Sequence, residues 1–155
     1  MKAKRRKIKQ LNALLKVRKI EEDLKMTELA KKLSAHKAHE DQIIMIQNLK
    51  KQVYSNIKND QMNNIDVSLM MKYQMYLREM HIKEIKSEQS LIETRFEVDQ
   101  KRHELQKSNQ NKVVVEKLID KQKDALKTQI DKLETKQQDE LSAQYFQRHD
   151  SGEVT

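Results

Sequence analysis

The fold is decided by the stretch NIKNDQMNN, which occupies residues 56–64. Four of its nine residues are Asn and one is Asp. Their side chains compete for backbone hydrogen bonds and tolerate left-handed backbone geometry, so the stretch predicts a turn. Asp66 then follows as a helix N-cap, with Ile65 and Met70 spaced to form a hydrophobic staple. We therefore expect a hinge over residues 59–65.

The chain on both sides of this turn is predicted to be helical. It contains no Pro, and its single Gly is at position 152, whereas sheets and sharp turns usually need these residues. Its apolar residues recur at alternating steps of three and four, the coiled-coil spacing, which also argues against a disordered chain. The seam expected before the turn contains Ile8, Leu11, Leu14, Val17, Ile20, Leu24, Met26, Leu29, Leu33, Ile43, Ile46, Leu49, Val53 and Ile57.

The predicted fold is all-α: two long helices form an antiparallel coiled-coil hairpin, and the second helix is longer than the first. We expect one domain over residues 1–155. Its parts are a first helix over about 5–58, the hinge, a second helix over 66–148 and a disordered tail over 149–155. A turn centred near position 62 makes the numbers of facing residues add up to about 125. In that register Leu33 faces Ile92, and Leu29 faces Phe96.

The second predicted helix is long enough to extend past the first. The first helix runs out near Ile119, so about 25 residues of the second lack an intramolecular partner at a rise of 1.5 Å per residue. An exposed apolar stripe is typical of a binding site. The apolar residues of this overhang are Ala125, Leu126, Ile130, Leu133, Leu141, Tyr145 and Phe146.

The charge is unevenly distributed. The formal net charge is +8, and the first nine residues contain six basic side chains and no acid. Such an end can bind nucleic acid, anionic lipid or an acidic protein surface. It has no interleaved aromatic residues, so stacking of single-stranded nucleic acid is poorly supported. The longest apolar run, residues 43–46, is far shorter than the roughly 20 residues that span a bilayer.

Nothing in the sequence predicts catalysis or a cofactor. The chain has no Cys for thiolate chemistry and no Gly-rich loop to hold phosphate. A pair of helices also offers no dry, concave site in which carboxylates acquire shifted pKa values. His36, His39 and Glu40 lie one turn apart but lack a clear fourth metal ligand. We therefore expect a protein that is not an enzyme and holds no metal.

The segment LMMKYQMYLREM, residues 69–80, is rich in Met, Tyr and Leu. Met and Tyr recur at adaptable binding surfaces. The residues alone leave two interpretations open, a locally richer core beside the turn and a binding surface.

Three parts of the chain resemble the FliJ family of flagellar type III export proteins. They are LNALLKVRKIEE at residues 11–22, NNID with KYQMYL at 63–66 and 72–77, and KVVVEKLIDKQK with KQQDEL at 112–123 and 136–141. The order of the three parts, the position of the hinge and the total length carry the resemblance together.

The resemblance implies a non-enzymatic stalk of the flagellar export apparatus, similar to the γ subunit of rotary ATP synthases and needed for flagellum biogenesis and chemotaxis. The implied partners are the export ATPase ring, whose hexamerisation such proteins promote, the cytoplasmic linker of the membrane export gate, and export chaperones. The implied location is the cytoplasm, peripherally at the inner membrane beneath the flagellum.

The resemblance also implies binding residues. The family's gate contacts follow the hinge and match Tyr76 and Met80, and we include Tyr73 and Leu77 from the same segment. The ATPase contacts are implied where the two chain ends meet, at the basic N-terminus and the overhang. The residues expected to bind the ATPase are Arg5, Arg6, Lys7, Leu126, Ile130 and Leu133.

Three alternatives remain at this stage. The first is the equivalent stalk protein of a virulence type III secretion system. The second is a coiled-coil scaffold that dimerises through the overhang. The third is a basic rod that binds nucleic acid, for which binding would depend steeply on salt.

Overall fold

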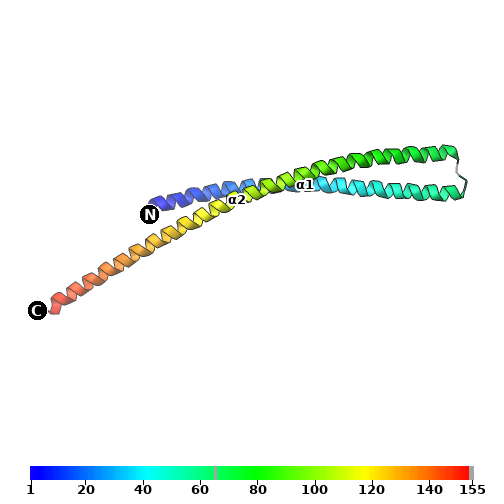
Figure 1. Cartoon of the computed structure of the whole chain (residues 1–155). Coiled ribbons are helices and arrows are strands. Elements are labelled where there is room, and N and C mark those ends of the chain that lie inside the picture. The colour runs from blue at the N-terminus through cyan, green and yellow to red at the C-terminus, as the bar shows by residue number, and fades with distance from the viewer. Residues whose placement is uncertain (65, 154–155) are drawn as a thin grey trace. The chain divides into compact units, whose positions relative to one another are not determined.

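The computed structural model describes residues 1–64 and 66–153, which form two helices. Helix α1 spans Lys2–Met62 and helix α2 spans Val67–Glu153 (Figure 1). The helices contain 61 and 87 residues, and the described part of the chain contains no strand. The predicted fold class, an all-α antiparallel coiled-coil hairpin with a longer second helix, is confirmed.

The connection lies within the predicted stretch. Asn64 adopts a positive φ of 60°, in the left-handed region that Asn tolerates better than most residues. Asp66 then caps α2 as predicted: its Oδ1 accepts a hydrogen bond from the Ser68 N–H at 3.4 Å, and its carbonyl accepts one from the Met70 N–H at 3.2 Å. The predicted staple involves Ile65, which lies outside the described residues.

Both helices are longer than predicted. Helix α1 continues to Met62 rather than ending near 58, and Asp60 in its last turn accepts a hydrogen bond from the Tyr73 hydroxyl. This contact between the helices outweighs the low helix propensity of Asn and Asp. Helix α2 continues to Glu153, so residues 149–153 of the predicted disordered tail are helical, and 154–155 lie outside the described residues. The ring of Tyr145 lies 4.3 Å from that of His149 and supports these last turns.

The chain divides into two compact units, each containing part of both helices. Unit 1 is Met1–Glu22 with Ser108–Thr155, and unit 2 is Asp23–Lys107. Unit 2 contains the connection and is a helical hairpin. Both helices run through both units, and a single domain over residues 1–155 stays a prediction.

In unit 2 the contact between the helices follows one seam on each helix. Buried and half-buried side chains recur at alternating steps of three and four residues, as knobs-into-holes packing requires. On α1 these seam positions are Lys25, Leu29, Lys32, His36, His39, Ile43, Ile46, Lys50, Val53, Ile57 and Asp60. On α2 they are Met70, Tyr73, Leu77, Met80, Glu84, Ser87, Leu91, Thr94, Val98, Lys101 and Leu105.

The predicted register is wrong. His36 contacts Thr94, with numbers that add up to 130, and Lys32 contacts Glu97. Ile92 and Phe96, which the sequence pattern placed against α1, are 70% and 73% exposed. The centre of the turn explains the shift: α1 ends at Met62 and α2 begins at Val67, so the chain reverses two to three residues later than predicted.

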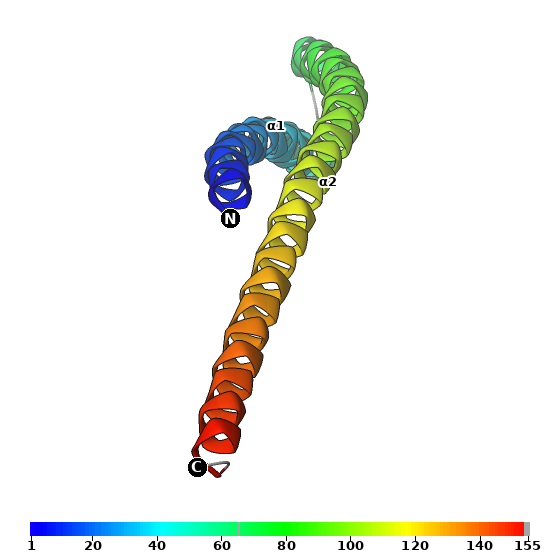
Figure 2. The ribbon, with the colours of Figure 1, turned by 90° about the vertical axis from the view of Figure 1, so that its left-hand side faces the viewer.

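Unit 1 is packed in the same way by fewer apolar residues. Val115 and Ile119 of α2 are buried, and Ile8, Leu11 and Leu15 of α1 are half-buried. Residues 131–151 of α2 are exposed throughout, where α2 continues past the first residues of α1 (Figure 1 and Figure 2). The predicted overhang is present, but it begins near residue 131, later than expected, because α1 starts at Lys2 and covers more of α2.

Candidate protein-binding surfaces

The seam of unit 2 is held partly by polar contacts. Lys50 forms an ion pair with Glu84, and both side chains are mostly buried. The hydrogen bond donated by Lys50 holds the pKa of Glu84 below its ordinary value. Buried Thr94 donates to the Ser90 carbonyl at 2.9 Å, and its hydroxyl lies 3.2 Å from the His36 Nδ1. These two polar contacts fix the register of the helices, because each polar side chain reaches its partner on the other helix in only one alignment.

A second polar cluster lies further along unit 2, where four side chains alternate in charge. The Lys25 Nζ donates to Glu104 at 3.2 Å, and the Lys101 Nζ donates to Glu28 at 3.1 Å and to Glu104 at 3.3 Å. The hydrogen bond from Lys101 lowers the pKa of Glu28, and the one from Lys25 lowers the pKa of Glu104. Because the side chains are partly exposed, solvent screening limits what each pair contributes.

The four predicted gate-binding residues occupy the side of α2 that faces α1. Met80 is only 6% exposed, and Tyr73, Tyr76 and Leu77 are half-buried. The Tyr73 hydroxyl donates to Asp60, and this bond raises the pKa of Tyr73. The segment after the turn is therefore partly core. Tyr76 and Leu77 keep an exposed part that a partner can contact, whereas Met80 does not.

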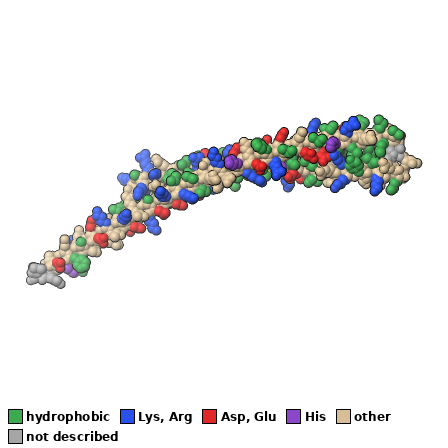
Figure 3. Space-filling view, viewed as in Figure 1, with side chains coloured by type: hydrophobic (Ala, Val, Ile, Leu, Met, Phe, Trp, Pro, Cys, Tyr) green, Lys and Arg blue, Asp and Glu red, His purple; other side chains and the backbone are tan. Residues whose placement is uncertain are grey.

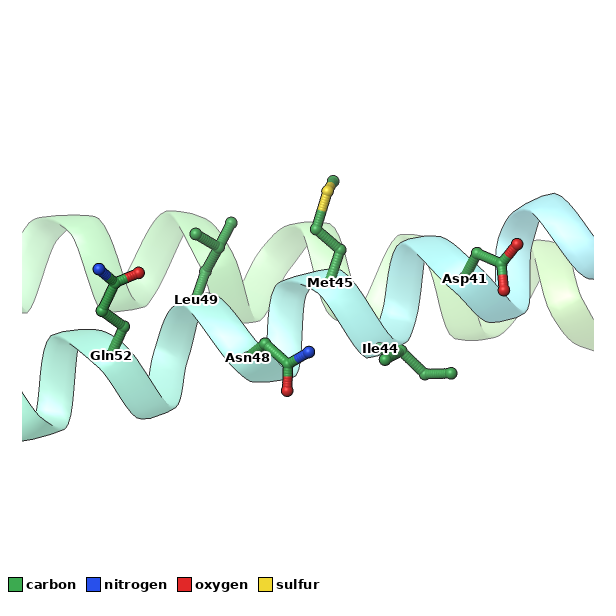
Figure 4. A pocket seen from close by; sticks show the side chains of 6 residues that line it. All are labelled: Asp41, Ile44, Met45, Asn48, Leu49 and Gln52. Atoms are coloured by element: carbon green, nitrogen blue, oxygen red, sulfur yellow. The ribbon is translucent and has the colours of Figure 1, made fainter.

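Sequence reasoning missed a groove on α1 of unit 2. It is lined by Asp41, Ile44, Met45, Asn48, Leu49 and Gln52. Figure 4 shows that all six side chains come from one face of α1. The sequence signal for this groove was the apolar run at residues 43–46. The seam between the helices uses only Ile43 and Ile46 of this run, so Ile44 and Met45 are left more than half exposed. Figure 3 shows apolar side chains gathered on unit 2 near the connection.

The predicted ATPase-binding residues all lie in unit 1. Arg5, Arg6 and Lys7 are exposed on the first turns of α1, and a shallow groove there is lined by Lys2, Ala3, Arg6, Lys7 and Gln10.

On α2, Leu126 and Ile130 are half-buried and belong to the end of the packed region, whereas Leu133 is exposed. Beyond Leu133, the large exposed apolar residues are Leu141, Tyr145 and Phe146. Among these predicted residues, the overhang proper therefore contains only Leu133.

Three further observations bear on the class of site. Among residues 1–64 and 66–153, no three His, Cys, Asp or Glu side chains lie close enough together to hold a metal ion. His36 packs in the seam, with its Nε2 3.0 Å from Glu40. Neither helix, over the same residues, has a stretch long and apolar enough to cross a bilayer.

Comparison with known proteins identifies a family. The family model described as "Flagellar FliJ protein" matches residues 7–151, nearly the whole chain. The chain belongs to the FliJ family. No curated protein sequence and no solved structure matches it.

Membership of the FliJ family makes this chain a stalk-like protein related to flagellar export, and the family is a non-catalytic component of that apparatus. The match runs through both units and through the connection, in agreement with the resemblance of the three quoted segments.

Proposed function

We propose that this FliJ-family protein binds the export ATPase ring through unit 1 and the cytoplasmic linker of the membrane export gate through unit 2. Binding to the ring promotes hexamerisation of the ATPase, and binding to the gate holds the protein peripherally at the inner membrane. It also escorts export chaperones. The family supplies the role in flagellar export.

One observation carries the ATPase contact: the apolar side chains of the overhang have no covering helix. Leu133, Leu141, Tyr145 and Phe146 are all at least 40% exposed. Each large side chain left in water forgoes roughly 1.5–3 kcal/mol of burial, which a surrounding protein ring supplies. The exposed Arg5, Arg6 and Lys7 belong to the same unit, and they steer unit 1 toward an acidic surface.

The gate contact is supported by the residues that unit 2 leaves accessible. Tyr76 and Leu77 keep exposed area beside the connection, and the α1 groove adds Ile44 and Met45. Tyr and Met are side chains that bind partners with adaptable geometry. Tyr76→Ala should therefore weaken gate binding without unfolding unit 2, which circular dichroism verifies. Unchanged gate binding by this variant would exclude Tyr76 from the contact.

The decisive experiment measures ATP turnover by the export ATPase with variants of this chain. A chain that ends at Lys132 keeps every packed residue of α2 and loses the overhang. We expect it to remain helical and to lose stimulation of the ATPase. A chain that ends at Asp150 keeps Leu133, Leu141, Tyr145 and Phe146 and is the matched control. Full stimulation by the chain ending at Lys132 would refute the overhang as the contact.

The alternative scaffold function uses the same exposed side chains to join two copies of the chain. Light scattering on the two truncated chains separates it from the stalk function. A scaffold loses self-association when the chain ends at Lys132, whereas a stalk loses only its effect on the ATPase.

A further inference from the structure

Helix α2 carries a second row of side chains that unit 2 does not cover. The row follows the same alternating steps of four and three as the seam, but on a different face of the helix. We call it the outer stripe. Its members are Met71, Met75, Arg78, Ile82, Ile85, Gln89, Ile92 and Phe96. The six apolar members are all 42–73% exposed.

The outer stripe is large enough for a stable interface. It extends over 26 residues, which correspond to about 39 Å of helix. At roughly 200 Å² for a large side chain, the exposed fractions leave on the order of 700 Å² of apolar surface on each chain. Standard protein interfaces bury about 800 Å² per partner. The flanking charged side chains supply the remainder through their aliphatic stems.

We propose that the outer stripe is an antiparallel coiled-coil interface with a second copy of this chain. The row is complementary to itself about a two-fold axis that passes between Ile82 and Ile85. In an antiparallel pair with this axis, each apolar member meets an apolar member, and the two polar members meet each other. The facing pairs are Met71 with Phe96, Met75 with Ile92, Arg78 with Gln89, and Ile82 with Ile85.

The charges beside the stripe match this arrangement. Along one flank, Lys72 meets Glu93 of the second copy, and Glu79 meets Lys86. On the other flank, the His81 imidazole meets the Glu88 carboxylate as a hydrogen-bond partner rather than as an opposite charge. The two-fold axis repeats every pair. Flanking pairs of opposite charge are what specify the partner and orientation of a coiled coil.

The charges also disfavour the parallel arrangement. Two copies aligned in parallel and in register place Glu88 against Glu93, and His81 against Lys86, so the first of these pairs is repulsive. The charged residues are available to a partner, since Lys72, Glu79, Lys86 and Glu93 make no ion pair among the residues that the structure describes.

Sedimentation equilibrium of the full chain over a range of concentrations tests the proposal. We expect a reversible dimer that Ile82→Glu abolishes. Ile44→Glu, on a similarly exposed isoleucine of α1, is the matched control and should leave the dimer unchanged. Circular dichroism confirms that both variants stay helical. A wild-type chain that is monomeric at every concentration would overturn the proposal, as would a dimer that survives Ile82→Glu.

A charge exchange tests the partner and the orientation together. One variant carries Lys72→Glu with Lys86→Glu, and the other carries Glu79→Lys with Glu93→Lys. Each alone should dimerise with a Kd weaker by roughly tenfold or more, because all four pairs on one flank become repulsive. An equimolar mixture should recover the wild-type affinity. A mixture that associates no better than the separate variants would overturn the proposed pairing.

The chain has no native Cys, so oxidative cross-linking of introduced Cys residues can show the relative orientation of the two chains in the dimer. Chains with Met71→Cys should cross-link to chains with Phe96→Cys in preference to chains of their own kind. Preferential self-linking of each variant would instead show a parallel pair and overturn the proposal. The charge-exchange variants keep the overhang, so the ATPase assay on them separates a failure of this interface from a failure of the proposed stalk function.

Discussion

Helix α2 presents two faces between residues 82 and 98, and the more apolar face is the one turned to solvent. The face toward α1 contains Glu84, Ser87, Leu91, Thr94 and Val98, whereas the outer face contains Ile82, Ile85, Gln89, Ile92 and Phe96. In this pair of helices, the most hydrophobic stripe of α2 is therefore not the one that is buried. The connection sets the register, and polar contacts such as Lys50 with Glu84 and His36 with Thr94 fit only that register.

Substitutions on the two faces should differ most in their effect on the free energy of unfolding. Met80→Ala removes a side chain that is 6% exposed and should lower the free energy of unfolding by about 2–5 kcal/mol. Met75→Ala removes the same atoms from the outer face, where the side chain is 65% exposed, and should change it by no more than about 0.5 kcal/mol. Denaturation followed by circular dichroism at low protein concentration measures both. Equal losses would show that the outer face is buried too.

Acid should weaken the polar seam next most strongly. Glu28, Glu84 and Glu104 have lowered pKa values because lysines donate hydrogen bonds to them. The unfolded chain therefore takes up protons before the folded chain does. The stability that these carboxylates contribute is fully present above the ordinary pKa of a glutamate, and it is lost as the pH falls through their lowered values.

Unfolding free energy measured from about pH 6 to pH 3 should therefore decrease below roughly pH 4.5. The Glu84→Gln variant should show a shallower decrease, because one of the three carboxylates is gone. A profile that is flat through this range would mean that these pairs contribute nothing to folding.

The Lys50–Glu84 pair should respond differently to one substitution than to two. Glu84→Gln leaves a mostly buried ammonium without its counter-charge and should lower the denaturation midpoint, by less than Met80→Ala does. Replacing Lys50 and Glu84 together by Met should restore the midpoint or raise it, because apolar side chains then fill the layer. Additive losses in the double variant would contradict this account of the pair.

Among the substitutions in the seam, Thr94→Val should have the smallest effect. It keeps the shape of the buried side chain and removes the hydroxyl that contacts His36. We expect a loss of about 0.5–1.5 kcal/mol, the usual net contribution of one hydrogen bond. A loss as large as that of Met80→Ala would mean that this contact does more than fix the register.

Much of the fold could be predicted from the sequence because its signals are local. The Asn-rich stretch places the connection, Asp66 caps α2, and the absence of Pro permits two long helices. The register could not be predicted, because two stripes on α2 share the coiled-coil spacing and the more apolar one is the outer stripe. Ile92 and Phe96 fitted the expected seam by spacing and hydrophobicity, but the position of the turn and the polar contacts of the other face select against them.

Some predicted binding residues are covered and others are accessible, because the predicted register and helix end were displaced by a few residues. Met80 and Tyr76 lie four residues apart, yet the true register buries Met80 and leaves part of Tyr76 accessible. Leu126 and Ile130 were expected on the overhang, but α1 begins at Lys2 and half-covers them. Leu133 lies past this cover. A few residues of error in the turn and in a helix end are enough to exchange a core position for a surface one.

The seam itself is tested most directly by engineered disulfides in this Cys-free chain. Cys at positions 36 and 94 replaces two side chains that contact each other in the polar seam, and Cys at positions 33 and 92 replaces the pair that the apolar pattern alone would select. A disulfide forms only between residues whose Cβ atoms lie close together. The double variant His36→Cys with Thr94→Cys should therefore form an intramolecular disulfide under mild oxidation, while Leu33→Cys with Ile92→Cys stays reduced. The reverse result would show that the apolar stripe is the true seam and would contradict the account.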